Sequence, residues 1–275
     1  MISEIGGAYC CDIRGAPPLN IKVHQGSNKS KCFFQIFRKT VNLHKISEKI
    51  EKYVAKFMNR VYYGNIIHEK GGIGMKQTVP VILASASPRR REILSMLGID
   101  FRVEVSDVDE TVNETEPGSI VEILAERKAE AVFARIDKED AAVIGSDTIV
   151  WKDGKVLGKP ADTADAERML TELSGAVNTV YTGVCIFLRI NNTIVKERFH
   201  CAADVEFAPM SDEEVRWYAG TGEPMDKAGA YAVQGLGGRF IRGIRGDYYT
   251  VMGLPMNALY EKLVKTGVLL AETRS

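Results

Sequence analysis

Two serines and three arginines stand together at the start of one expected helix, where they could bind an anion. Ser85 and Ser87 enclose a short polar turn, and Pro88, which suits the first position of a helix, precedes Arg89, Arg90 and a third arginine. Free N–H groups at a helix N-terminus, hydroxyl groups and guanidinium forks all favour a phosphate. We therefore expect a phosphate site here, with solvated arginines on a basic helix start as the alternative.

Carboxylates whose clustering or position suggests a function occur in two other places. Asp107, Asp109 and Glu110 lie within four residues, and such a cluster could hold a divalent cation or could be a solvated acidic loop. Asp147 lies inside an apolar run at 141–151, where an unpaired carboxylate is costly. Metal coordination or general-base chemistry would explain its position.

The elements that must hold these residues alternate between strand and helix from residue 75 onward, which favours an α/β domain. An apolar strand at 79–84 leads into the helix that begins at Pro88 and ends at Gly98. Ser119-x-x-Glu122 and Ser211-x-x-Glu214 match capping boxes, and Lys128 lies near the middle of the first capped helix. The remaining expected elements are a turn at Asp153-Gly154, a helix at 163–173, a hairpin of 179–190 with 193–207, a short strand at 239–242, a loop at 246–255 and a helix at 256–265.

The first 74 residues differ from the rest of the chain. Residues 1–74 hold 12 Lys+Arg and 5 Asp+Glu, whereas the whole chain has formal net charge +0. This break predicts a domain boundary, with a basic extension at 1–74 and a folded domain at 75–275. Apolar residues at helical spacing predict an amphipathic helix at 42–63, and 71–74 is expected to be a linker. The extension is either an added segment of unassigned role or the product of an upstream start codon, and its basic charge makes nucleic acid a low-ranked partner.

Composition excludes several classes of protein. Apolar content of 45% and charged content of 26% are typical of a globular enzyme. There is no apolar run of membrane-spanning length and no signal-peptide pattern. Five cysteines without Cys-x-x-Cys spacing argue against a disulfide framework or a zinc site. We expect a cytoplasmic protein with no membrane partner.

Five segments, taken in order, resemble the Maf family of nucleoside triphosphate pyrophosphatases. They are Ser-Ala-Ser-Pro-Arg-Arg at 85–90, Val-Asp-Glu at 108–110, the Lys128 helix, Ser-Asp-Thr at 146–148 with Gly-Lys-Pro at 158–160, and Tyr-Ala-Val-Gln-Gly at 231–235 with Gly-Asp-Tyr-Tyr at 246–249. The resemblance implies an α/β fold with a twisted mixed sheet flanked by helices, two lobes and a central cleft, similar to inosine triphosphate pyrophosphatase. It also implies hydrolysis of a nucleoside triphosphate to the monophosphate and pyrophosphate.

The resemblance carries residue roles with it. Asp147 matches the proton acceptor, and Glu110 and Asp147 are expected to hold a divalent metal, Mg²⁺ or alternatively Mn²⁺. The cations and hydroxyl groups that would neutralise the triphosphate are those of Ser85, Ser87, Arg90, Lys128 and Lys159. The nucleobase would be recognised by Arg89, Thr148 and Gln234.

Thr148 beside Asp147, together with Gln234, resembles the branch of the family that cleaves dTTP and UTP. The amide of Gln234 can offer a donor and an acceptor to the imide edge of a pyrimidine. A pyrophosphatase for 7-methyl-GTP or another modified nucleotide is the alternative within the same class. A nucleotide-binding inhibitor of septum formation is the alternative from another class. A homodimer is expected from the family alone.

Overall fold

The computed structural model describes residues 2–5, 8–11 and 75–271 of the chain. The chain divides into two units, Met1–Gly72 and Ile73–Ser275. In the first unit, β1 (Ile2–Ile5) and β2 (Ala8–Cys11) form an antiparallel pair. The helix predicted at 42–63 and the linker predicted at 71–74 lie outside the described residues. Across the described part of the chain, no helix combines the length and the hydropathy needed to cross a membrane.

A mixed sheet of seven strands forms the centre of the second unit. The order of its strands is β10-β9-β8-β6-β4-β5, with β7 paired to β6. Parallel pairing joins β4 to β5 and to β6, and the remaining pairs in the sheet are antiparallel. The strands are β4 (Val81–Leu83), β5 (Phe101–Val103), β6 (Ala141–Lys152), β7 (Lys155–Leu157), β8 (Val177–Ile190), β9 (Thr193–Phe207) and β10 (Ile241–Arg245). A separate antiparallel pair is formed by β3 (Met75–Gln77) and β11 (Leu269–Ala271).

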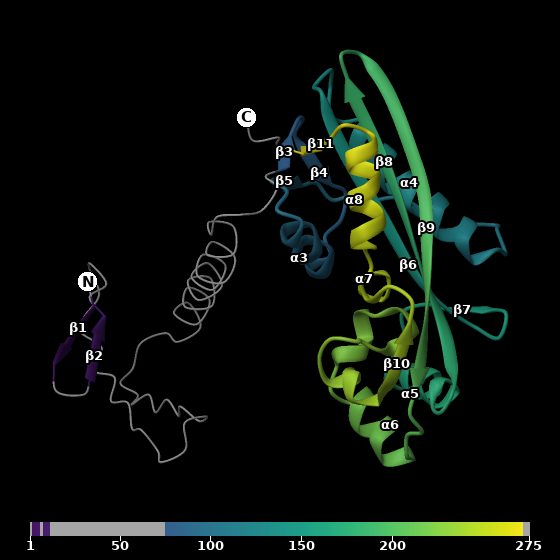
Figure 1. Cartoon of the computed structure of the whole chain (residues 1–275). Helices are drawn as coiled ribbons and strands as arrows, with labels where there is room; N and C mark the ends of the chain where they lie inside the picture. The colour runs from purple at the N-terminus through teal and green to yellow at the C-terminus, as the bar shows by residue number, and fades with distance from the viewer. Residues whose placement is uncertain (1, 6–7, 12–74, 272–275) are drawn as a thin grey trace. The chain divides into compact units, whose positions relative to one another are not determined.

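Helices flank this sheet, and the long strands β6, β8 and β9 connect its two ends (Figure 1). Because side chains alternate along a strand, neighbouring residues of β6 enter different cores. Ala142 and Ile144 pack with α3, α7 and α8, whereas Ala141 and Val143 pack with α4. A further core forms around α5 and α6 with the far ends of β6, β8 and β9. The helices are α3 (Pro88–Met96), α4 (Pro117–Phe133), α5 (Thr163–Leu173), α6 (Asp212–Ala219), α7 (Tyr248–Met252) and α8 (Met256–Lys265).

Two glycines let α4 lie unusually close to the sheet. A Cβ on Gly145 would lie 2.3 Å from the carbonyl oxygen of Ala125, and one on Gly183 would lie 2.3 Å from that of Val121. No other residue type fits at such distances without displacing the helix. The α4 backbone therefore rests directly on β6 and β8.

Most of the elements expected from the sequence are confirmed. The 163–173 helix and the last helix begin and end at the predicted residues. The hairpin of β8 and β9 turns at Asn191 and Asn192, which have φ of 49° and 62°. The capping box of Ser211 and Glu214 is present with both of its hydrogen bonds. The α/β class and the mixed sheet flanked by helices are confirmed as well, and the cleft between two lobes stays a prediction.

Three local expectations are wrong. The N-cap of α4 is Glu116, whose carboxylate accepts from the N–H groups of Gly118 and Ser119, so Ser119 lies in the first helical turn. The predicted loop at 246–255 contains α7, because the Asp247 side chain caps a helical turn. The strand expected at 239–242 begins only at Ile241, since 236–240 form a 3-10 helix.

Candidate active site

The candidate site lies where β4 and β5 end beside the longer β6. The register pairs Leu83, the last residue of β4, with Val103 of β5 and with Ile144 of β6. The segments that follow β4 and β5 therefore leave the sheet next to residues 145–148. Crevices outside the carboxyl ends of parallel strands are the usual ligand sites in such sheets.

Three charged side chains form the ionic cluster of this site, namely Lys128, Glu110 and Asp147. The Lys128 Nζ lies 2.6 Å from Glu110 Oε1 and 2.5 Å from Asp147 Oδ1. The Lys128 and Asp147 side chains are only 13% and 12% exposed, whereas Glu110 is 61% exposed. One ammonium group thus joins a buried carboxylate to one that faces solvent.

The fold explains why Lys128 reaches Asp147. Residues 145 and 147 point to the same face of β6, and α4 rests on Gly145 through Ala125 and Ala129. Lys128 lies in the same helical turn as these alanines. The close approach that Gly145 permits therefore brings the Lys128 ammonium onto the Asp147 carboxylate.

The cations around Glu110 favour its ionised form. The hydrogen bond from Lys128 lowers the pKa of Glu110 below its ordinary value, and the charges of Lys159 and Arg90 act in the same direction. Burial lowers the pKa of the Arg90 guanidinium, while the carboxylates of Asp147 and Glu110 oppose that shift. Lys128, Lys159 and Arg90 thus bring positive charge close to Glu110, where it could attract an anion.

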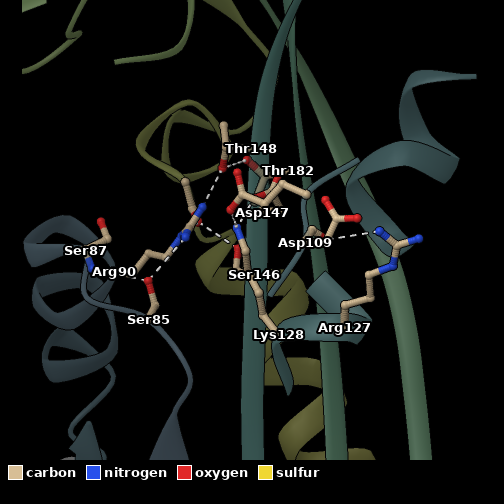
Figure 2. Close-up of polar contacts among 12 residues, drawn as sticks. Ser85, Ser87, Arg90, Asp109, Arg127, Lys128, Ser146, Asp147, Thr148 and Thr182 are labelled. Atoms are coloured by element: carbon tan, nitrogen blue, oxygen red, sulfur yellow. Dashed lines mark hydrogen bonds and ion pairs between the residues drawn. The ribbon is translucent and has the colours of Figure 1, made fainter. Parts of the chain in front are cut away.

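On the other face of β6, Arg90 organises a hydrogen-bonded cluster made of Ser85, Arg90, Ser146, Thr148 and Thr182. Its Nε donates to the Gly253 carbonyl at 2.8 Å, its Nη1 to Ser85 Oγ at 3.2 Å and its Nη2 to Thr148 Oγ1 at 3.1 Å (Figure 2). These bonds use three of the five N–H groups of a guanidinium. Arg90 therefore joins β4, β6 and the end of α7, with N–H groups left over for a ligand.

The same cluster secures α7 to the sheet. Ser146 Oγ donates to the Gly253 carbonyl at 3.0 Å, and Thr182 Oγ1 donates to the Thr250 carbonyl at 2.7 Å. Thr148 and Thr182 also share a hydrogen bond of 2.9 Å. Gly253 has φ of 103° and ends α7, which gives its carbonyl the orientation that Arg90 and Ser146 share.

The acidic loop that carries Glu110 is held from α4 by the residue before Lys128. Arg127 Nη1 donates to the carbonyl groups of Asp109 at 3.0 Å and Thr111 at 2.7 Å, and Figure 2 shows Arg127 directed at this loop beside Lys128. The Asp109 side chain accepts from the Thr111 N–H. Adjacent residues of α4 thus bind the backbone of the loop and its carboxylate.

The side chains of the other predicted site residues make no hydrogen bond or ion pair to these clusters, among the residues that the structure describes. Ser87 is the N-cap residue of α3, Arg89 is half-buried, and Lys159 and Gln234 are exposed. The pKa of Glu110 responds to Lys159, so this lysine lies within electrostatic reach. The structure brings together Ser85, Arg90, Thr148, Glu110, Lys128 and Asp147.

The donor set fits a hard divalent cation. Glu110 and Asp147 offer oxygen atoms that already converge on one ammonium group. Among the described residues, no group of three or more acidic, His or Cys side chains could hold a metal ion. Mg²⁺ is commonly held by one or two carboxylates together with substrate phosphates, and two carboxylates are what this site supplies.

Reasoning from the sequence missed several contributors to the site. Arg127, Ser146, Thr182 and Gly253 were not singled out, although Ser146 lies inside the Ser-Asp-Thr segment. Asp247 directly before the largely apolar stretch 248–252 matches the N-cap signal of a helix start, and it could have located α7. The glycines at 145 and 183 gave no local signal, because their role depends on a helix packed against them.

Comparison with known proteins identifies the family of this chain. The family model described as "Maf-like protein" matches residues 80–266. Proteins named dTTP/UTP pyrophosphatase from Symbiobacterium thermophilum and Clostridium novyi are each 50% identical, over 68% of this chain and 94% and 98% of their own lengths. One from Desulforamulus reducens is 46% identical over 69% of this chain and 97% of its own. The matched region contains both clusters described above, and the chain belongs to the Maf-like protein family.

Proposed function

We propose that this protein is a nucleoside triphosphate pyrophosphatase that hydrolyses dTTP and UTP to the monophosphate and pyrophosphate. The observation that carries the proposal is the ammonium of Lys128 held 2.6 Å from Glu110 and 2.5 Å from Asp147, next to Arg90 and Lys159. The names of relatives 50% identical to this chain support the same reaction and the pyrimidine substrates.

In the proposed reaction Asp147 is the general base. The oxygen of a water molecule forms a bond to the α-phosphorus while the bond from that phosphorus to the bridging oxygen of the β-phosphate breaks. The Asp147 carboxylate accepts the proton of the water, and pyrophosphate leaves with the electron pair of the broken bond. The hydrogen bond from the Lys128 ammonium at 2.5 Å orients the Asp147 carboxylate.

The cations of the site are proposed to bind the triphosphate. Arg90, Lys128 and Lys159 would neutralise the phosphates, with the hydroxyl groups of Ser85 and Ser87 as further donors. Glu110 and Asp147 are proposed to hold a divalent cation, Mg²⁺ or Mn²⁺. When bound, such a cation would neutralise charge that develops on the phosphate oxygens.

Base recognition is proposed to involve Arg89, Thr148 and Gln234. Gln234 is exposed and its amide offers a donor and an acceptor. Thr148 already bonds to Arg90 and Thr182, so a contact from its hydroxyl group to a base would have to share these partners.

A product assay with a panel of triphosphates tests the proposal. The panel should contain dTTP, UTP, 7-methyl-GTP and the common purine triphosphates, with and without Mg²⁺, and should separate pyrophosphate from orthophosphate. We expect pyrophosphate from dTTP and UTP. Preferred cleavage of 7-methyl-GTP would replace the pyrimidine assignment, and binding without turnover would replace the enzyme by a nucleotide-binding protein.

A cytoplasmic location and a homodimer are proposed as well. The location is supported by Cys185 and Cys201, which are free thiols as expected in a reducing compartment. Light scattering on the purified protein tests the dimer, and fractionation of cells tests the location.

A further inference from the structure

The segment that carries Gln234 is fastened on both sides of that residue by one glutamate and one tyrosine. Glu223 begins the 3-10 helix Glu223–Asp226, and Tyr218 lies in α6. Neither residue belongs to the two clusters of the candidate site. Both act on the backbone of residues 232–237, which surround Gln234.

The contacts form a clamp that we define as the side chains of Glu223 and Tyr218. On the far side of Gln234, Glu223 Oε2 accepts from Leu236 N and Oε1 accepts from Gly237 N, both at 3.0 Å. On the near side, the Tyr218 hydroxyl accepts from Ala232 N at 3.1 Å. The same hydroxyl donates to Glu223 Oε1 at 2.9 Å, which joins the two halves.

Two glycines make this approach possible. A Cβ on Gly235, which has φ of 108°, would lie 2.5 Å from Glu223 Oε2. A Cβ on Gly237 would lie 2.3 Å from the Tyr218 hydroxyl oxygen. The backbone beside Gln234 is therefore shaped to fit the clamp.

Burial and charge make the clamp rigid. The Tyr218 side chain is fully buried, and burial raises its pKa, so the phenol stays neutral and can both donate and accept. Burial also raises the pKa of Glu223, but the N–H groups of Leu236 and Gly237, the Tyr218 hydroxyl and Lys227 outweigh it and leave the pKa below its ordinary value. Glu223 is thus an ionised acceptor for these bonds at neutral pH.

The residues that precede the clamped segment lie near residues of the candidate site. The N–H of Gly229 donates to the carbonyl of Gly158 at 2.9 Å, next to Lys159. The charge of Arg89 contributes to the lowered pKa of Asp226, after the larger contribution from Lys227. The 3-10 helix that begins at Glu223 therefore lies within electrostatic reach of another proposed base-reading residue.

We propose that Glu223 and Tyr218 are positioning residues, which fix the Gln234 segment and thereby set the selectivity of the enzyme for a pyrimidine base. This inference rests on the proposed function. Within the described part of the chain, the side chains of Glu223 and Tyr218 make no hydrogen bond to either cluster, so we expect the clamp to act through Gln234 and to leave the chemical step unchanged.

Two conservative variants break the clamp while they keep its shape. Glu223→Gln replaces an acceptor by an amide N–H that meets a backbone N–H, and Tyr218→Phe keeps the ring and removes the hydroxyl group. Tyr260→Phe is the control, because it makes the same change of side chain in α8, where the hydroxyl group lies 4.0 Å from the Met75 sulfur. Gln234→Ala removes the amide itself and therefore shows in which direction the selectivity for UTP over ATP should change.

The first measurement is steady-state kinetics with UTP and with ATP. We expect both clamp variants to lower the kcat/KM ratio of UTP over ATP by about tenfold or more, the size expected when a polar contact to a base is lost. The change should appear in KM while kcat for UTP stays within about threefold. Gln234→Ala should change the ratio in the same direction, and Tyr260→Phe should leave it unchanged.

The second measurement is amide hydrogen exchange at Ala232, Leu236 and Gly237, which needs no turnover. We expect faster exchange at these amides in the clamp variants and normal exchange in the control. Unchanged exchange, or faster exchange with an unchanged UTP/ATP ratio, would overturn the inference. A wild-type protein that cleaves no triphosphate would overturn the proposed function and the claim about base selection, while exchange would still report on the clamp.

Discussion

Neighbouring residues of β6 make different kinds of contact on the two faces of the strand. Asp147 faces α4 and accepts a hydrogen bond from the ammonium of Lys128, which also forms an ion pair with Glu110. Ser146 faces α7 and donates to the carbonyl of Gly253. Thr148 faces the same way and bonds to Arg90 and Thr182, which in turn donate to the carbonyl groups of Gly253 and Thr250. The first face thus presents charged groups, whereas the hydrogen bonds of the second face link separate elements of the fold.

Ser146, Asp147 and Thr148 are consecutive in the sequence, but the two faces of β6 give them different roles. The ionic cluster is held by three side chains, of which Glu110 is 61% exposed. The hydrogen-bonded cluster ties β4, β6 and α7 together through Arg90. We infer that chemistry belongs mainly to the α4 face and rigidity mainly to the α7 face.

The largest effect is expected from Asp147→Asn, which keeps the shape of the side chain and removes its basicity. Turnover of dTTP should fall by about 10²–10⁴-fold, the range typical of general-base loss. Binding of a non-hydrolysable dTTP analogue should survive, because a negative charge near the phosphates is gone. Single-turnover hydrolysis and calorimetry should be measured together. Lost binding in a folded protein would make Asp147 chiefly a metal ligand, and retained turnover would transfer the role of base to another residue.

Gly145→Ala tests whether the ionic cluster depends on the contact between α4 and β6. The added Cβ would lie 2.3 Å from the Ala125 carbonyl oxygen, so α4 must shift and Lys128 with it. We expect a loss of about 1–3 kcal/mol in the free energy of unfolding and a strong loss of turnover. Gly243→Ala is the matched control, since nothing lies within 4 Å of its added Cβ. Equal stability and turnover in the two variants would refute the dependence.

Arg90 belongs to the rigid face and is also a proposed phosphate ligand, so its variants separate the two tasks. Arg90→Ala should lower kcat/KM by about tenfold to a hundredfold, as expected for one lost charged contact, and should lower the melting temperature. Arg90→Lys restores the charge without the planar fork. We expect lysine to recover part of the activity and little of the thermal stability. Full recovery of both would mean that the three hydrogen bonds of Arg90 contribute little.

The ionic cluster should lose its contribution to stability in acid, when Glu110 becomes protonated. Its pKa is lowered from the ordinary 4.5, mainly by Lys128. A carboxyl group with a depressed pKa contributes stability that is fully present above its ordinary pKa and is lost as the pH falls through the lower, folded value. NMR titration should therefore place the Glu110 midpoint below 4.5. In Lys128→Met the midpoint should move upward, and an unchanged midpoint would contradict the ion pair.

The smallest effect is expected from removal of residues 1–74, because this change leaves both faces of β6 intact. A chain starting at Met75 retains β3, which pairs with β11 from Met75↔Ala271 to Gln77↔Leu269, and every residue of the two clusters. It should fold and keep wild-type kcat/KM. Circular dichroism and the pyrophosphate assay would check this. An insoluble or inactive product would show that residues before Met75 support the domain.

The sequence by itself determined the elements whose signals are local. The Asn191-Asn192 turn, the Ser211–Glu214 capping box and the strand that carries Asp147 all depend on residues a few positions apart, so their physical causes are visible in the chain. The same local reasoning failed at Ser119, because Glu116 could cap α4 just as well and Pro117 fixed the helix start one turn earlier.

Only the tertiary structure decided which partner each site residue has. Lys128 meets Asp147 across 19 positions of sequence, Arg90 meets Thr148 across 58, and Arg90 meets Gly253 across 163. Alternation along β6 required Asp147 and Thr148 to face opposite ways, but the sequence does not say which helix covers each face. Sheet register and the close approach at Gly145 and Gly183 fix that choice, and these depend on packing between segments distant in the chain.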